Sequence, residues 1–173
     1  MSQKQSNNSD DNSYHELKRL LTEGVSLDQP AASPSSPGQL HEDDGDLQGA
    51  LGLYAEAAQD MATASLERSL GRHFACADYC NQVAEKAAQA VSLLRFGRRS
   101  MYDHDLRTLG TAVGAPEEIQ NEMATLSPFH PESFYADTPP EEADEVINED
   151  QANSYIKSAR KVLRWARGIV LAA

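Results

Sequence analysis

From Asp46 onward, apolar residues recur every three or four positions along the chain, and this spacing is compatible with few folds. Residues at this spacing share one side of a helix, so each repeat predicts an amphipathic helix. No run of alternating apolar and polar residues bounded by turn residues occurs, so strands are not expected. We therefore predict an all-α fold, an up-and-down bundle of about five helices over residues 47–172.

Two long helices are expected first, with a break near Gly71. The apolar stripe predicted for the first helix consists of Leu47, Leu51, Tyr54, Ala58, Met61 and Ser65. The second helix runs from about Arg72 to Gly97 and is apolar on two sides, which is typical of a helix at the centre of a bundle. The narrow polar row that this helix leaves for water consists of Asp78, Gln82, Glu85, Lys86 and Gln89.

Three further helices follow. Asp103 is expected to cap a short one, which places His104 in its first turn. Pro116 opens the next, and the last runs from about residue 150 to residue 171. Residues 127–150 are rich in proline and acids, so we expect an extended connection with a solvated acidic edge.

Residues 1–46 carry nine acidic and three basic residues among clusters of Ser, Asn, Pro and Gly. This composition cannot bury enough apolar surface to order itself, so we predict a disordered acidic arm. Within the arm, residues 14–23 have helical spacing. They form either a short docking helix or a transient one, because helices of about ten residues are marginal alone.

The formal net charge is −12 and the sequence pI is near 4.7, which excludes a polyanion binder with a basic overall field. The spread of the acids favours adaptation to high salt, and an ordinary acidic protein is the alternative. Neither a membrane span nor an apolar secretory signal is present, so we expect a cytoplasmic protein. Cys76 and Cys80 lack further ligands for a metal and are expected to be buried thiols, and we expect no metal and no cofactor.

From about residue 50 to residue 171, the chain resembles a HEPN domain, the "higher eukaryotes and prokaryotes nucleotide-binding" helical domain. The resemblance rests on the segments ALGLYAEAAQDMATASL, ACADYCNQVAEKAAQAV, YDHDLRTLG, Tyr135-Ala136-Asp137 and the Ala-x-x-Val-Leu-x-Trp-Ala pattern from Ala159 to Ala166. It implies a dimeric helical bundle. Many members of the family resemble metal-independent ribonucleases. Others act as toxin partners of minimal nucleotidyltransferases, or as nucleotide-binding or scaffolding modules.

The ribonuclease signature of the family is an Arg followed by a His after four to six residues. Arg99 stands four residues before His104, and Arg98 stands five before it. Metal-free cleavage of RNA needs a group that moves a proton and cations that stabilise the phosphate, which His and Arg supply. His104, Arg99 and Arg98 are therefore the candidate catalytic residues. Alternatively, His104 and its neighbouring acids only cap a helix and the two arginines lie in a solvated loop.

Five further residues are candidates for contact with a nucleotide or RNA: Lys86, Asp105, Tyr135, Arg160 and Arg164. Lys86 can instead form a surface ion pair. The basic stripe of the last helix can instead pair with the acidic residues 137–150 or with acids of a partner. Phe134 stands where family members often have an arginine, which removes one phosphate contact.

We predict a binding and regulatory module that forms a homodimer. It would recognise a nucleotide or RNA, or it would partner a minimal nucleotidyltransferase. The alternative is a toxin-like, metal-independent endoribonuclease that uses His104 with Arg98 and Arg99. The family resemblance supports the module more directly than it supports an activity.

Overall fold

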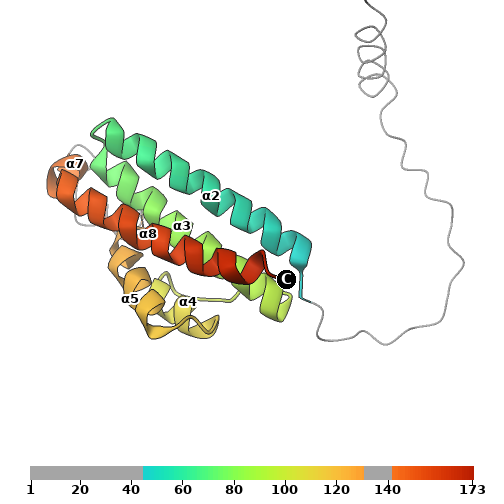
Figure 1. Cartoon of the computed structure of the whole chain (residues 1–173). Helices are drawn as coiled ribbons and strands as arrows, with labels where there is room; N and C mark the ends of the chain where they lie inside the picture. Colours follow the sequence, from blue (N-terminus) through green and yellow to red (C-terminus); the bar gives the residue numbers. More distant parts are fainter. Residues whose placement is uncertain (1–44, 131–141) are drawn as a thin grey trace, which may run out of the picture. The chain divides into compact units, whose positions relative to one another are not determined.

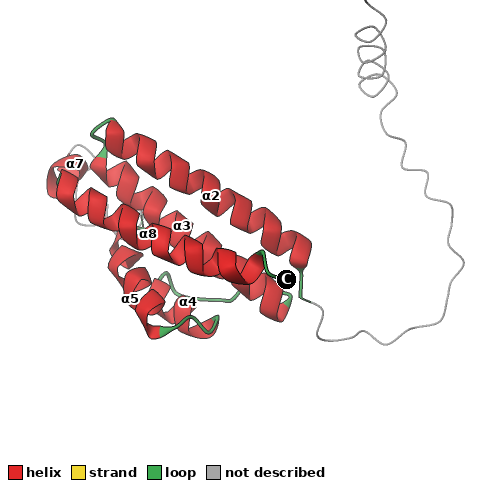
Figure 2. Cartoon of the chain, in the orientation of Figure 1, coloured by secondary structure: helices red, strands yellow, loops and turns green. Residues whose placement is uncertain are grey.

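The computed structural model of the chain describes residues 45–130 and 142–173. Its elements are α2 (Leu47–Ser69), α3 (His73–Phe96), α4 (Leu106–Ala112), α5 (Glu117–Leu126), the short 3-10 helix η1 (Ser127–Phe129), α7 (Ala143–Val146) and α8 (Glu149–Val170). Figure 2 shows helices and loops and no strand over these residues, so the all-α prediction is confirmed. Most of the arm, including residues 14–23, lies outside the described residues, as does Tyr135.

The directions of the four longest helices, α2, α3, α5 and α8, alternate along the chain. The long helices α2, α3 and α8 lie side by side, and α4 and α5 pack beneath them (Figure 1). α5 runs antiparallel to α3, since Arg95 near the end of α3 bonds the carbonyl of Val113, whereas Asn81 in the first half of α3 bonds that of Leu126. Within the described stretches, no helix is long and apolar enough to cross a membrane.

α3 is the central helix, as its two apolar sides predict. It packs against α2, α8, α5 and α4. Its fully buried residues are mostly small: Cys76, Ala77, Cys80, Ala84, Ala87, Ala88 and Ala90. Small side chains allow neighbouring helix backbones to approach closely, so this composition suits a helix that is surrounded by others.

The predicted apolar face of α2 was only partly right: Met61 is buried and Tyr54 packs against the core, but Leu47, Leu51 and Ala58 are exposed. The helix buries Ala50, Leu53, Ala57, Met61 and Ala64, whereas Leu47 and Leu51 are 42% and 40% exposed. α2 carries apolar residues on both sides, so periodicity alone could not select the buried side. The side that carries the three alanines faces the core, and Leu47 and Leu51 face outward.

Short helices occupy the described parts of the connection before α8, where an extended segment over residues 127–150 was expected. Residues 127–129 form η1 and residues 143–146 form α7, while residues 131–141 lie outside the described residues. The ring of Phe129 packs 4.4 Å, centroid to centroid, from that of Tyr155 on α8. Asn148 then caps α8: its side chain accepts from the amide of Gln151, and the Gln151 side chain accepts from the amide of Asn148.

Candidate functional site

The loop between α3 and α4 begins at Gly97, which ends α3 in the left-handed conformation with φ of 64°. Gln89 of α3 holds this loop. Its Nε2 donates to the carbonyl of Ser100 at 2.8 Å, and its Oε1 accepts from the amide of Ser100 at 2.9 Å. The hydroxyl of Ser92 donates to the carbonyl of Arg98 at 2.7 Å. The loop is thus fixed on both sides of Arg99.

These contacts correct the predicted polar row of α3. Gln89 was expected to face water but is only 5% exposed, because it points under the loop and not outward. The Oδ1 atom of Asp78 is also buried, and it has no hydrogen-bond partner among the described residues. Gln89 lies between Ala87, Ala88, Ala90 and Val91. A polar residue inside so apolar a run is the sequence signal that could have indicated a buried role.

Arg98 and Arg99 line one hollow of about 460 Å³, which we call the loop hollow. Its other lining residues are Phe96, Ser100, Met101 and Ala112. Both arginines are exposed, and no carboxylate lines this hollow. The loop hollow therefore offers two guanidinium groups to an anion, next to the exposed apolar side chains of Phe96 and Met101.

Arg99 also lines a second cavity of about 200 Å³ together with Lys86, which we call the Lys86 cavity. The structure thus brings together two of the predicted site residues. The Nζ atom of Lys86 lies 2.8 Å from Asp60 and 3.5 Å from Glu56, both on α2. Burial lowers the pKa of Lys86, but the two carboxylates raise it more, so its pKa lies above its ordinary value. With two carboxylates close by, the charge of Lys86 is largely compensated.

His104 lies before α4 and not in its first turn. The predicted cap, Asp103, is displaced by Asp105, whose Oδ1 accepts from the amide of Arg107 at 3.0 Å and whose Oδ2 accepts from the hydroxyl of Thr108 at 2.9 Å. The Asp105 carboxylate is therefore engaged in capping. His104 has φ of 66°, a conformation that a residue with a side chain rarely adopts.

The exposed ring of His104 has two aromatic neighbours. The ring of His130 lies 4.2 Å away, centroid to centroid, at an interplanar angle of 35°. The ring of Tyr102 lies 5.8 Å away in an edge contact. Burial raises the pKa of Tyr102, and a hydrogen bond with Glu85 raises it further.

His130 was not among the predicted site residues. Its Nδ1 atom is buried and has no hydrogen-bond partner among the described residues. Burial raises the pKa of Asp78, while a hydrogen bond from Gln82 and the charge of His130 lower it. Nothing in the local sequence of His130 indicates that its ring stacks on that of His104, because the two residues lie far apart in the sequence.

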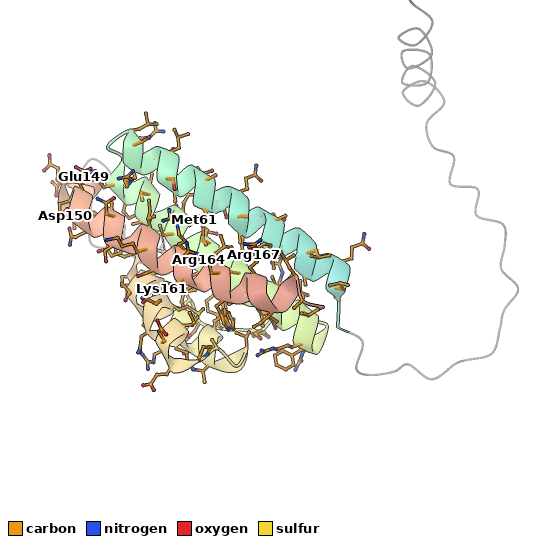
Figure 3. All side chains as sticks on the ribbon, in the orientation of Figure 1. Met61, Glu149, Asp150, Lys161, Arg164 and Arg167 are labelled. Atoms are coloured by element: carbon orange, nitrogen blue, oxygen red, sulfur yellow. The ribbon has the colours of Figure 1, made fainter. Side chains whose placement is uncertain are left out.

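The basic stripe of α8 consists of Lys157, Arg160, Lys161, Arg164 and Arg167, all exposed. Figure 3 labels Lys161, Arg164 and Arg167 along this helix. Lys161 pairs with Glu118 and Glu122 of α5. Arg164 and Arg167 line a separate open hollow of about 500 Å³. Within the described stretches, no ion pair engages Arg160 or Arg164, and neither lines the loop hollow.

The candidate catalytic residues and Lys86 thus divide into three groups. Arg98 and Arg99 share the loop hollow, Lys86 joins Arg99 in the second cavity, and His104 stacks on His130 without lining either. Over residues 45–130 and 142–173, no cluster of His, Cys, Asp and Glu suited to a metal ion occurs. Cys76 and Cys80 are free and fully buried.

Comparison with known proteins gives one match. The model of the HEPN domain family matches residues 50–169, which span the bundle from α2 to α8. No curated protein and no solved structure matches the chain.

Proposed function

The chain belongs to the HEPN domain family, and from this premise we propose that it is a helical module that binds phosphate groups of RNA or of a nucleotide in the loop hollow. The observation that supports this most directly is that Arg98 and Arg99 line a hollow without any carboxylate, on a protein whose net charge is −12. A local cationic site can attract phosphate even where the net charge is negative, because salt screens the exposed carboxylates that lie more than about 10 Å away.

The fixed loop supports the same proposal. Gln89 and Ser92 order the backbone around both arginines, so less conformational entropy is lost when a ligand binds. The Lys86 cavity is a weaker candidate for phosphate, because Asp60 and Glu56 compensate the charge of Lys86. Arg160 and Arg164 on α8 would add a second contact to the backbone of a longer RNA.

Fluorescence anisotropy with a labelled single-stranded RNA oligomer tests the proposal. We expect the variant with both Arg98→Ala and Arg99→Ala to bind at least about tenfold more weakly, because it cannot form the charge-assisted hydrogen bonds to phosphate. The slope of log affinity against log salt should fall by about 0.7 for each phosphate that the variant no longer neutralises. Arg72→Ala is the matched control, since it removes one exposed positive charge at the other end of α3. An equal drop in affinity in this control would contradict a local site.

A metal-independent endoribonuclease is the second candidate, and the exposed, stacked His104 favours it. The imidazole can move a proton near neutral pH, and the loop arginines precede it closely in sequence. RNA incubated with the wild type in EDTA should be cleaved, and His104→Ala should abolish the cleavage. If both proteins cleave RNA equally, His104 has no catalytic role.

We further propose that the module acts as a cytoplasmic homodimer. Leu47 and Leu51 at the start of α2, and Leu66 and the C-cap residue Leu70 at its end, are each between 40% and 56% exposed. With the exposed Ala55, Ala58 and Ala62 between them, they form an apolar row that a second copy can cover. A minimal nucleotidyltransferase, as in a toxin–antitoxin pair, is the protein partner that the family implies. A gene for such an enzyme next to the gene for this chain would support that partnership.

A further inference from the structure

The Lys86 cavity shares Arg99 with the loop hollow but has a different lining. Leu53 is its one apolar lining residue, and the others are charged or amide side chains from α2, α3 and the loop: Glu56, Gln82, Glu85, Lys86, Gln89 and Arg99. Its volume of about 200 Å³ is less than half that of the loop hollow. Pockets that enclose a drug-sized ligand begin at about 300 Å³, so this cavity suits a single small ring system and not a whole nucleotide.

Two of the polar side chains around the cavity are already engaged within the protein. Gln89 uses both ends of its amide on Ser100. The Nζ atom of Lys86 lies 2.8 Å from Asp60 and 3.5 Å from Glu56. Recognition of a ligand in this cavity therefore depends mainly on the other charged groups that line it.

Glu85 and Arg99 are the charged lining residues without an ion pair in the part of the chain that the structure describes. The half-buried Glu85 accepts a hydrogen bond from the Tyr102 hydroxyl. An ionised carboxylate has about four lone-pair sites and no donor, so Glu85 can accept further hydrogen bonds and donate none. The cavity thus favours a ligand that presents N–H donors to Glu85.

Guanine is the nucleobase whose edge fits a carboxylate best. Its Watson–Crick edge has two adjacent donors, N1–H and the N2 amino group, followed by the acceptor O6. The two donors match the two oxygens of one carboxylate, and O6 can accept from a neighbouring cation such as Arg99. Adenine and cytosine present one amino group beside an acceptor, and uracil presents one N–H between two acceptors. Each of these would direct an acceptor at the carboxylate.

We propose that the Lys86 cavity is a guanine pocket, in which Glu85 accepts from N1–H and the N2 amino group of a guanosine phosphate whose phosphate binds Arg98 and Arg99. This rests on the proposed function, because the loop hollow supplies the phosphate contact. Arg99 lines both spaces, so one nucleotide spans them, with the base in the smaller and the phosphate in the larger. Glu56 and Glu85 line only the base cavity, so the phosphate is kept apart from them.

Isothermal titration of the full chain with GMP, IMP, AMP and UMP tests the pocket. GMP should bind at least about tenfold more tightly than AMP or UMP, because a bidentate contact between a side chain and a base discriminates by about this factor. IMP keeps N1–H and lacks the amino group, so its affinity should lie between those of GMP and AMP.

Two RNA oligomers, compared by fluorescence anisotropy, distinguish the two sources of guanosine. If RNA is the source, a uridine oligomer with one internal guanosine should bind at least about tenfold more tightly than the same oligomer without it. If the free nucleotide is the source, the two oligomers should bind alike while GMP keeps its advantage over AMP and UMP.

The result that overturns the guanine pocket differs from the result that overturns the proposed function. Equal affinity for all four nucleotides and for both oligomers, with binding that still depends on Arg98 and Arg99, would remove the pocket and leave the phosphate site in place. Failure of the wild type to bind any of these nucleotides or RNA oligomers would refute the phosphate site, and the pocket with it.

Glu85→Gln tests the residue that reads the base. The amide offers one acceptor and one donor in place of two acceptors, so the preference for guanine should disappear, while affinity for the uridine oligomer should not fall. Glu117→Gln, an exposed acid of α5, is the control and should bind GMP as the wild type does. Circular dichroism checks that each variant is folded, and the nucleotide series with the wild type decides the matter if Glu85→Gln is not. A guanine preference that persists in a folded Glu85→Gln variant would show that another group reads the base.

Discussion

Gln89 makes two hydrogen bonds to a single residue, Ser100, as donor to its carbonyl and acceptor from its amide. This contact joins the central helix to the loop that carries Arg98 and Arg99. Replacing the side chain with an apolar one of similar size therefore tests whether loop order matters for binding.

We expect Gln89→Leu to lower the free energy of unfolding by about 1–2 kcal/mol, because leucine cannot form these two partly buried hydrogen bonds. RNA affinity should fall as well, since the loop arginines are no longer fixed. Urea unfolding and fluorescence anisotropy measure the two effects. Gln59→Leu, at an exposed position of α2, is the control and should change neither. Full RNA affinity in Gln89→Leu would show that the ligand does not use this loop.

The helices could be predicted from the sequence because each rests on local spacing. α3, with apolar residues on two sides, was correctly placed at the centre. Where the sequence allows two equally good local arrangements, it could not predict which one the chain adopts. Asp103 and Asp105 are both good caps, and only packing of Leu106 and its bond to Ser127 selects the second. The buried face of α2 was only partly predicted for the same reason.

The candidate site was predicted only in part. The pattern that links Arg98, Arg99 and His104 is local and could be read from the chain. His130 and Gln89 make contacts between separate elements, which no local spacing encodes. Lys161 of the basic stripe of α8 pairs with Glu118 and Glu122 of α5, whereas the prediction named the acidic residues 137–150 or the acids of a partner.

The left-handed conformation of His104 predicts an order of stability among its variants. At φ of 66°, alanine keeps the unfavourable contact of its Cβ atom and glycine does not. The free energy of unfolding of His104→Gly should therefore be about 1 kcal/mol higher than that of His104→Ala. Chemical denaturation of both variants measures this difference. A lower stability for the glycine variant would mean that the loop changes conformation when the ring is removed.

The apolar row on α2 predicts how the oligomer responds to a charge. Leu51→Glu and Leu66→Glu place a carboxylate in the proposed interface, and each should weaken self-association at least about tenfold, because less apolar surface is buried and the carboxylate is desolvated. Analytical ultracentrifugation in high salt measures the mass. Leu171→Glu, 54% exposed at the end of α8, is the control. A dimer that survives both α2 variants must use another surface.

Glu122 links α5 to α8 and predicts a response to acid. The hydrogen bonds from Lys161 and Ser158 hold the pKa of Glu122 below its ordinary value. Its contribution to stability is therefore present above the pKa of an unfolded Glu and is lost as the pH falls through the lower value of the folded state.

Glu122→Gln should lower the free energy of unfolding by about 1 kcal/mol at pH 6, and the difference from the wild type should disappear near pH 2. Urea unfolding at several pH values measures it. Glu117→Gln is the control, an exposed acid of the same helix with no ion pair in the described residues. A difference that persists unchanged in acid would show that the interaction does not depend on the carboxylate.

The two cysteines predict how the native protein resists alkylation. Cys76 and Cys80 are both fully buried on α3, and the hydrogen bond that the Cys80 thiol donates to Cys76, together with burial, raises the pKa of Cys80. The thiolate is the reactive form, so labelling requires both exposure and deprotonation. With a typical free energy of unfolding of about 5 kcal/mol or more, iodoacetamide should label Cys80 at least about a thousandfold more slowly in the native chain than in urea.

Mass spectrometry after timed quenching measures the two rates. An Ala62→Cys variant supplies an exposed thiol on α2 as the control and should be labelled at the rate of the unfolded chain. Rapid native labelling of Cys80 would mean that α3 opens locally, which a helix packed on every side should not do.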